Sequence, residues 1–189
     1  MAAPARGAAF RATRQRAPRP GHRRGGLLPR PGPQRGQQTG PSPVDRGRAG
    51  SKHHLITDAH GTPVAVTLTG GHRNDVTQLI PLLDAIPPIR GRVGRPLRRP
   101  RRLFADRGYD HDKYRRLLWA RGIRPMIARR GVAHGSGLGT HRWVVERSFA
   151  WLHQHKRLRV RSEVRADIHL GLLTLASALI CLRRLQHSN

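Results

Sequence analysis

Two short segments, Phe104-Ala-Asp-Arg-Gly-Tyr-Asp110 and Arg142-Trp-Val-Val-Glu-Arg147, are the most informative parts of this sequence for fold and function. They place Asp106 after an apolar pair and Glu146 within a helical pattern, in a chain with 37 Lys and Arg but only 10 Asp and Glu residues. Carboxylates from separate elements can hold Mg²⁺ for phosphoryl transfer on nucleic acid. A turn-capping Asp and a solvated helical Glu would give the same letters, and spacing alone favours this second interpretation.

The composition predicts one domain that binds a polyanion. The chain has 189 residues, a formal net charge of +27 and a pI of about 12.0, which indicate DNA or RNA as the partner, with a membrane surface as the weaker alternative. Residues 1–25 contain no apolar signal-peptide core. The longest apolar run, Leu170 to Leu182, is shorter than the roughly 20 residues of a membrane span, so we expect no membrane partner. The single Cys181 excludes disulfides and thiolate zinc sites and suits a reducing cytoplasm.

Residues 1–44 differ in character from the rest of the chain. They contain eight Pro, seven Gly and nine Arg, and no Asp or Glu. Without apolar periodicity, nothing offsets the entropy of ordering them. We therefore expect a disordered basic segment, which could follow a phosphate backbone. Out-of-frame translation of GC-rich DNA would produce the same composition.

Residues 45–187 show the pattern of a folded domain. Val64, Val66 and Leu68 alternate as in a strand. Asp58 is placed to begin a turn, and Asp75 with Gln78 has the spacing of a helix capping box. The predicted strands are 52–57, 63–69, 103–105 and 124–128, and the predicted helices are 75–86, 111–121, 140–157 and 167–185. This order predicts a mixed α/β domain.

A basic linker, residues 90–102, leads directly into the strand before Asp106. It contains Arg98, Arg99, Arg101 and Arg102. Such a charge run is usually a solvated loop, but its position is equally compatible with a loop that contacts phosphate. These four arginines are therefore candidate DNA-binding residues.

Several motifs follow one another in a fixed order. They are Pro43-Val-Asp-Arg-Gly-Arg-Ala-Gly-Ser-Lys-His-His-Leu-Ile-Thr-Asp58, Gly61-Thr-Pro63, Asp75-Val-Thr-Gln-Leu79, Ala105-Asp-Arg-Gly-Tyr-Asp110, and His141-Arg-Trp-Val-Val-Glu-Arg147 with Trp151-Leu152 and Lys156-Arg-Leu158. In this order they resemble an insertion-sequence transposase of the DDE class, most nearly the insertion-sequence-five group. The resemblance covers residues 41–185, and it reverses the preference for the capping interpretation.

The resemblance implies a ribonuclease-H-like fold, a mixed sheet flanked by helices, and metal-dependent DNA transposition by strand nicking and strand transfer. Asp106 matches the second catalytic Asp and Glu146 the catalytic Glu, both of which are metal ligands. Arg142, one helical turn before Glu146, matches a basic residue of that motif, and Lys156 is a further candidate DNA contact. The implied cofactor is Mg²⁺ in a two-metal site. The implied partners are mobile-element ends and target DNA, and an active protein would be a homo-oligomer.

The sequence departs from the family at the first catalytic Asp. Family members carry it on a strand before the segment that matches Ser51–Thr57, whereas residues 21–38 contain no acid and no strand pattern. We therefore expect the sheet to lack its first strand and to expose an edge. We hypothesise that residues 1–39 derive from a shifted reading frame or a truncated element. With two of three carboxylates, the second metal should bind poorly, and we expect weak or absent activity.

Two other functions are compatible with the residues. One is a non-catalytic basic nucleic-acid-binding remnant in which Asp106 and Glu146 are vestigial. The other is a general ribonuclease-H-like nuclease, which the Trp-Val-Val-Glu context disfavours. The roles of Tyr109 and Asp110 stay open at this point.

The remaining His and aromatic residues predict no further site. His53 and His54 point to opposite faces of a strand, and His153 lies two residues before His155 on a helix, which is poor spacing for one metal ion. The three aromatic residues of the Glu146 helix are predicted to be core, because large aromatics dominate protein interiors. They are Trp143, Phe149 and Trp151.

Overall fold

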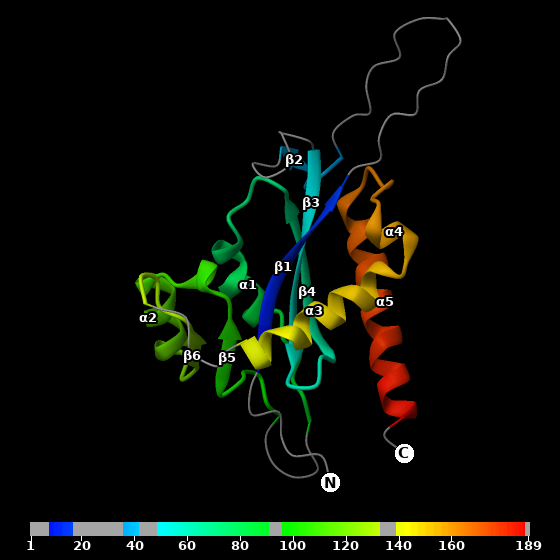
Figure 1. Ribbon diagram of the computed structural model, residues 1–189. Helices are drawn as coiled ribbons and strands as arrows, with labels where there is room; N and C mark the ends of the chain where they lie inside the picture. Colours follow the sequence, from blue (N-terminus) through cyan, green and yellow to red (C-terminus); the bar gives the residue numbers. More distant parts are fainter. Residues whose placement is uncertain (1–7, 17–35, 42–48, 91–95, 133–138, 188–189) are drawn as a thin grey trace, which may run out of the picture.

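The strands of this computed structural model form one mixed sheet (Figure 1). The structure describes residues 8–16, 36–41, 49–90, 96–132 and 139–187. The strand order is β4-β3-β1-β5-β6, and the short β2 pairs with the start of β3. The strands are β1 Ala8–Arg16, β2 Gly40–Pro41, β3 Ala49–Asp58, β4 Pro63–Gly70, β5 Arg102–Ala105 and β6 Arg124–Ile127.

β1 is the central strand of this sheet. It pairs antiparallel with β3 along its whole length and parallel with β5 from Ala8 to Phe10, where Phe10 is the partner of Ala105. The expectation of a missing first strand is therefore wrong, and so is the expectation of disorder for residues 8–16 and 36–41. The physical reason is that ladder hydrogen bonds use backbone groups, which every non-proline residue supplies. The rest of the 1–44 segment lies outside the described residues.

Helices cover both faces of the sheet, so the domain has three layers (Figure 1). Neighbouring strand residues point to opposite faces: Leu55 is buried with α3, α4 and α5, and Ile56 with α1 and α2. The mixed α/β class is confirmed. The helical segments are the 3-10 turns η1 Asp75–Gln78 and η2 Arg107–Tyr109, and α1 Leu79–Asp84, α2 Asp112–Ala120, α3 Gly139–His153, α4 Lys156–Arg159 and α5 Ala166–Gln186.

The predicted helix 140–157 is divided in the structure. α3 ends at His153, and the short α4 begins at Lys156. This break lets Leu158 turn inward and join Leu152 in the same buried cluster. The predicted helix 75–86 is likewise the turn η1 followed by α1, which ends before Pro87.

The turn and cap predicted for Asp58 and Asp75 have different outcomes. Asp58 Oδ1 accepts hydrogen bonds from the backbone N–H groups of His60 and Thr62, both at 2.8 Å, so the predicted turn is confirmed. The capping box at Asp75 is wrong, because the side chain of Asn74 caps η1 by accepting from Val76 N–H at 3.3 Å. Asp75 instead forms an ion pair with Lys52, whose Nζ lies 2.6 Å from its carboxylate.

α5 is long and apolar enough to cross a membrane, by length and composition alone. The apolar run counted from the sequence is shorter than a span, but the helix that contains it has 21 residues. Length therefore does not exclude a membrane. A core helix of a soluble protein passes the same test, and His169, Leu173, Ala176 and Ile180 of α5 are buried against the domain.

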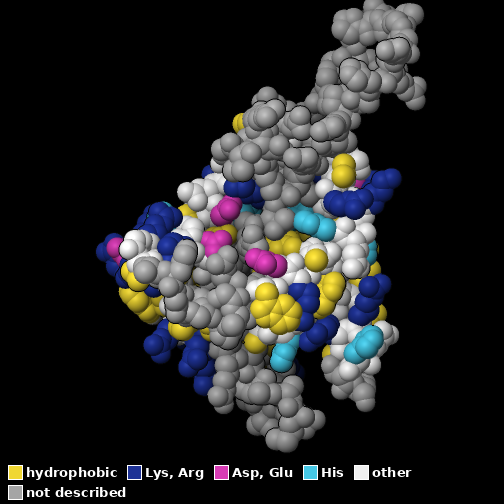
Figure 2. Space-filling view, in the orientation of Figure 1, with side chains coloured by type: hydrophobic (Ala, Val, Ile, Leu, Met, Phe, Trp, Pro, Cys, Tyr) yellow, Lys and Arg dark blue, Asp and Glu magenta, His cyan; other side chains and the backbone are white. Residues whose placement is uncertain are grey.

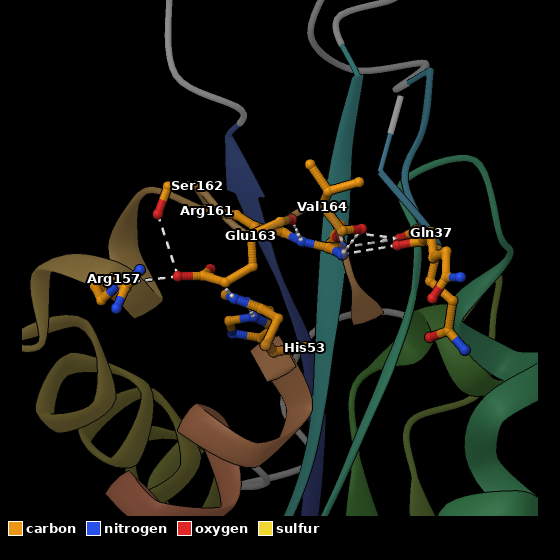
Figure 3. Close-up of polar contacts among 10 residues, drawn as sticks. Gln37, His53, Arg157, Arg161, Ser162, Glu163 and Val164 are labelled. Atoms are coloured by element: carbon orange, nitrogen blue, oxygen red, sulfur yellow. Dashed lines mark hydrogen bonds and ion pairs between the residues drawn. The ribbon is translucent and has the colours of Figure 1, made fainter. Parts of the chain in front are cut away.

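A buried polar network joins the start of α5 to the sheet (Figure 3). The guanidinium of Arg161 is buried and donates hydrogen bonds to the carbonyl oxygens of Gln37 at 2.8 Å and Glu163 at 3.0 Å, and to Ser51 Oγ. Gln37 N–H in turn donates to the carbonyl oxygen of Val164 at 2.8 Å. The segment before β2 is thus held against the loop before α5.

Two histidines continue this network into the core. His169 Nδ1 lies 2.9 Å from Glu163 Oε2, and His169 Nε2 lies 2.9 Å from His53 Nε2. Because a carboxylate only accepts, Nδ1 of neutral His169 carries the proton, and its Nε2 accepts from His53. Burial lowers the pKa of both histidines, against the hydrogen bond from His169 to Glu163, which raises the pKa of His169. Burial therefore favours the neutral form of both imidazoles.

We expect the domain to lose stability as the pH falls from near neutral. Burial lowers the pKa of His54 from 6.5 to about 4, and His53 and His169 shift in the same direction. The unfolded chain therefore binds more protons than the folded chain below pH 6.5, and the stability present above that pH is lost between it and the folded pKa values. His54 alone should contribute about 3 kcal/mol of this loss. Urea unfolding at a series of pH values measures it.

His54→Gln is the matched control for this pH dependence. Its amide can keep the hydrogen bond that His54 Nε2 makes with Thr69 Oγ1 at 2.7 Å, but it does not titrate. The loss of stability on acidification should be smaller in this variant. A wild-type unfolding free energy that is flat across the window would contradict the prediction.

Candidate active site

Asp106 lies at the carboxyl end of β5, where the chain turns toward α2. Its Oδ1 accepts a hydrogen bond from Gly108 N–H at 2.6 Å, so it caps η2. A Cβ at Gly108 would lie 2.8 Å from this oxygen, which explains the glycine there. The side chain is half-buried. Asp106 is thus a capping residue that is also held at the carboxyl edge of the parallel strands, where ligands bind in α/β sheets.

Asp110 has a structural role that the sequence did not reveal. Its buried carboxylate accepts from Arg115 Nε at 2.6 Å and from Arg130 N–H at 2.7 Å, and Arg115 also donates to the carbonyl oxygen of Ile127 at 2.6 Å. Burial by itself raises the pKa of Asp110, but the hydrogen bonds from Arg130 and Arg115 bring it below its ordinary value. Asp110 therefore ties α2 to the end of β6, directly after the turn that presents Asp106.

Glu146 lies on the exposed side of α3. Its neighbours Val145 and Phe149 are buried, whereas Glu146 itself is exposed. α3 is in contact with β1, β3 and β5, so the elements that carry Asp106 and Glu146 are neighbours in the fold. On the buried side of α3, Ser148 Oγ donates a hydrogen bond to the carbonyl oxygen of Gly61 at 2.7 Å. This bond helps to fix the rotation of α3 about its own axis.

The described residues do not fit a two-ion metal centre. In the part of the chain that the structure describes, no group of three or more His, Cys, Asp or Glu side chains is arranged to hold a metal ion. Asp106 and Glu146 are two carboxylates on neighbouring elements, and two carboxylates are too few for a centre in which each of two ions needs protein ligands.

The candidate DNA-binding arginines of the linker are all exposed. They are Arg98, Arg99, Arg101 and Arg102. Arg98, Arg99 and Arg101 line a hollow of about 560 Å³ between the linker and Gly122. They therefore form a group of exposed positive charges at and just before the start of β5.

The other basic candidates lie on α3 and α4. Lys156 is exposed at the first residue of α4. Arg142 is part of α3, but its side chain lies outside the described residues. Figure 2 shows basic side chains along both sides of one face of the molecule, with a few acidic side chains near its middle. Lys156 therefore belongs to the layer of α3, α4 and α5, whereas the linker arginines lie at and just before the start of β5.

Trp143 is not a core residue, contrary to the prediction, whereas Phe149 is buried. Trp143 is 50% exposed, and the guanidinium carbon of Arg147 lies 4.4 Å from its ring centroid and 4.9 Å from that of Trp151. Arg147 also donates to the carbonyl oxygen of His60 at 2.6 Å. The spacing Trp-x-x-x-Arg-x-x-x-Trp, which stacks side chains four residues apart on one helix face, could have shown this.

Comparison with known proteins gives two findings. The family described as the transposase DDE domain matches residues 12–181 of this chain. The chain is also similar to a Burkholderia cepacia protein that is named as a transposase for insertion sequence element IS402. The two are 60% identical over 152 residues, which are 80% of this chain and 72% of the relative.

We expect the substitution of Asp106 to lower the free energy of unfolding less than the substitution of Asp110. Asp106→Ala removes a cap and should lower the free energy of unfolding by about 1 kcal/mol. Asp110→Ala leaves the buried Arg115 without its carboxylate and should cost about 3 to 5 kcal/mol. Urea unfolding at neutral pH compares them. Equal losses would show that Asp106, too, is mainly a structural residue.

Proposed function

The chain belongs to the transposase DDE domain family, a family of DNA transposition, and from this premise we propose that it binds DNA but cuts it poorly or not at all. The basic surface supplies the binding. The strand-cutting centre is incomplete, because two of the three carboxylates that the family's mechanism uses are present. Membership of the insertion-sequence-five group is part of this proposal.

The observation that carries the proposal is the composition of β1. Its sequence, Ala-Ala-Phe-Arg-Ala-Thr-Arg-Gln-Arg, contains no acidic residue. Phe10 is in register with Ala105, the residue before Asp106. If the same register continues by one residue, Arg11 is the backbone partner of Asp106. In this proposal, a basic residue therefore replaces the missing carboxylate.

The sheet order supports a ribonuclease-H-like fold for the domain at residues 45–187 together with β1. In this order, the first strand of the chain lies between an antiparallel neighbour and a parallel neighbour, as β1 lies between β3 and β5. The resemblance places the first catalytic Asp on that strand and the second at the end of the parallel neighbour. In this proposal Asp106 is the second carboxylate, and β1 contains no acidic residue to provide the first.

A divalent cation is the general requirement of transposase DDE domains, and Mg²⁺ would supply Lewis-acid stabilisation of a phosphate undergoing displacement. Asp106 and Glu146 are the residues that would hold it. Two carboxylates leave a second ion without protein ligands of its own. This chain is therefore suited to weak binding of one cation and not to two-ion catalysis.

DNA is the partner that the charge distribution supports. The chain carries a net charge of +27, and the exposed arginines of the linker precede β5 directly. Binding through phosphates releases counterions, so it is strong at low salt, falls steeply as salt rises and depends little on base sequence. Element ends and target DNA would both be bound in this way.

We expect the linker arginines to account for part of the salt dependence of DNA binding. Replacing Arg98, Arg99, Arg101 and Arg102 by Ala should make the slope of log affinity against log salt shallower by about 3 to 4, at about 0.9 for each phosphate contact. Fluorescence anisotropy with a labelled duplex measures the slope. The four-fold Arg→Lys variant is the control, and it should keep the wild-type slope because charge is conserved. An unchanged slope in the Ala variant would remove these residues from the interface.

We expect Arg11→Asp to create strand-cutting activity. The wild-type protein should nick supercoiled DNA in Mg²⁺ or Mn²⁺ no faster than Asp106→Ala or Glu146→Ala. Arg11→Asp should nick at least about 10-fold faster, which corresponds to about 1.4 kcal/mol of barrier, and a second substitution at Asp106 should abolish the gain. Arg14→Asp is the matched control, because it makes the same charge change three residues further along β1.

Two results would overturn this proposal. Metal-dependent nicking by the wild-type chain that is lost in Asp106→Ala and Glu146→Ala would show a complete centre. No nicking by Arg11→Asp, in a variant that melts like wild type, would show that the missing carboxylate is not the cause of inactivity.

A further inference from the structure

α5 has a second apolar face that the domain does not cover. Ile168, Leu175, Leu179 and Leu182 are all exposed, and Leu175 is 59% exposed. Their spacing of seven, four and three residues places them on one side of the helix. The buried residues of α5, among them Leu173 and Ile180, lie on the other side. We call the four exposed residues the outer stripe of α5.

The outer stripe is unusual for this protein because it lacks charge. Between Ile168 and Leu182, α5 contains no Asp, Glu, Lys or Arg. The rest of the chain carries the excess of basic residues. A contiguous apolar face on a highly charged surface marks a contact with another apolar surface.

We propose that the outer stripe is the contact between two copies of this chain, with the two α5 helices antiparallel around a twofold axis at Leu175. The stripe is self-complementary about this residue. Ile168 and Leu182 are each seven residues from Leu175, so the axis places Ile168 of one copy opposite Leu182 of the other. A twofold contact requires this kind of symmetry. If one residue of the first copy contacts a different residue of the second copy, the reverse contact must also form.

The charges at the ends of α5 favour the antiparallel arrangement. Asp167 lies in the first turn, where it forms an ion pair with Arg165 at 2.5 Å, and Arg183 and Arg184 lie in the last turn. Antiparallel helices keep the basic last turns of the two copies apart, and they oppose the helix dipoles. A parallel arrangement would place basic turns together. Since each copy carries a net charge of +27, an uncharged stripe is also where two copies repel each other least.

The surface beside the stripe has room for a partner's side chains. A hollow of about 240 Å³ opens between α4 and α5, and its apolar lining includes Leu158, Leu172, Leu175 and Leu179. A Cβ built on Gly171, one turn away, would meet no atom within 4 Å. Leucine side chains from a second α5 can pack into such a surface as knobs into holes.

Other occupants fit the stripe less well. An isolated membrane-spanning helix would face lipid on all sides, whereas His169, Leu173 and Ile180 are packed within the domain. DNA is attracted by charge, which the stripe lacks. The contact between copies is therefore independent of DNA and of the catalytic centre, and it survives if the proposed function fails.

The experiment is sedimentation equilibrium of the nuclease-treated full chain in about 1 M salt, where charge-mediated bridging through DNA is screened. The wild-type chain should be a dimer at micromolar concentration. Leu182→Glu should weaken dimerisation at least 30-fold. Leu97→Glu is the matched control, because Leu97 is 49% exposed against 51% for Leu182 and belongs to the linker, where its backbone pairs with Ile89. It should leave the dimer unchanged.

A crosslinking variant tests the axis itself. In a Cys181→Ser background, Leu175→Cys should form an intermolecular disulfide on mild oxidation, and Leu97→Cys should not. A monomeric wild-type chain, or a dimer that Leu182→Glu leaves intact, would overturn the proposal. So would binding of the monomer to neutral phosphatidylcholine vesicles through the stripe. Circular dichroism of each variant, matching wild type, shows that folding is retained.

Discussion

The two backbone ladders of β1 are the interaction on which the rest of the structure depends. One ladder joins β1 to β3, and the other joins it to β5. Without them, the β3–β4 hairpin and the β5–β6 pair would be separate pieces of sheet, and α3 would lack the continuous surface on which it packs. Because ladder hydrogen bonds are made by the backbone, the strand can be built from a segment that carries none of the family's side chains there.

The sheet depends on backbone hydrogen bonds, whereas the catalytic chemistry depends on side chains. A chain can therefore keep the fold without keeping the catalytic residues. A strand position in a sheet needs only an extended backbone. A metal centre needs carboxylates that are close enough to bind the same ion. β1 meets the first requirement and contains no acid to meet the second. Asp106 is then left at a well-formed sheet edge, held by its own cap, beside a strand that contributes no negative charge.

Two of the scarce acidic side chains are buried and anchor neighbouring elements through hydrogen bonds. Asp110 pairs with the buried Arg115, and Glu163 accepts from His169 and contacts Arg157 at 2.8 Å. Burying such groups without partners would cost several kcal/mol each. Asp110 follows Asp106 by four residues, and the two carboxylates of this turn have different roles. Asp110 holds α2 against β6, and Asp106 faces the edge of the sheet.

Local patterns predicted most elements because they depend on short-range rules. Alternation gave β4, the turn at Asp58 formed as predicted, and a glycine in left-handed conformation, Gly122 with φ +68°, ends α2. The errors arose where local rules competed. Asn74 and Asp75 are both residue types that favour helix caps. In the structure Asn74 is the cap, and Asp75 forms an ion pair with Lys52 of β3.

The sequence by itself determined the family and the α/β class, and it singled out Asp106, Glu146 and a polyanionic partner for the proposals, because ordered motifs, charge and periodicity are properties of the chain alone. The tertiary structure decided three things. It placed residues 8–16 at the centre of the sheet, exposed Trp143, and left one face of α5 uncovered. Each depends on which surfaces meet across long separations in the chain, and an apolar residue carries no local signal of whether its partner lies within the same molecule.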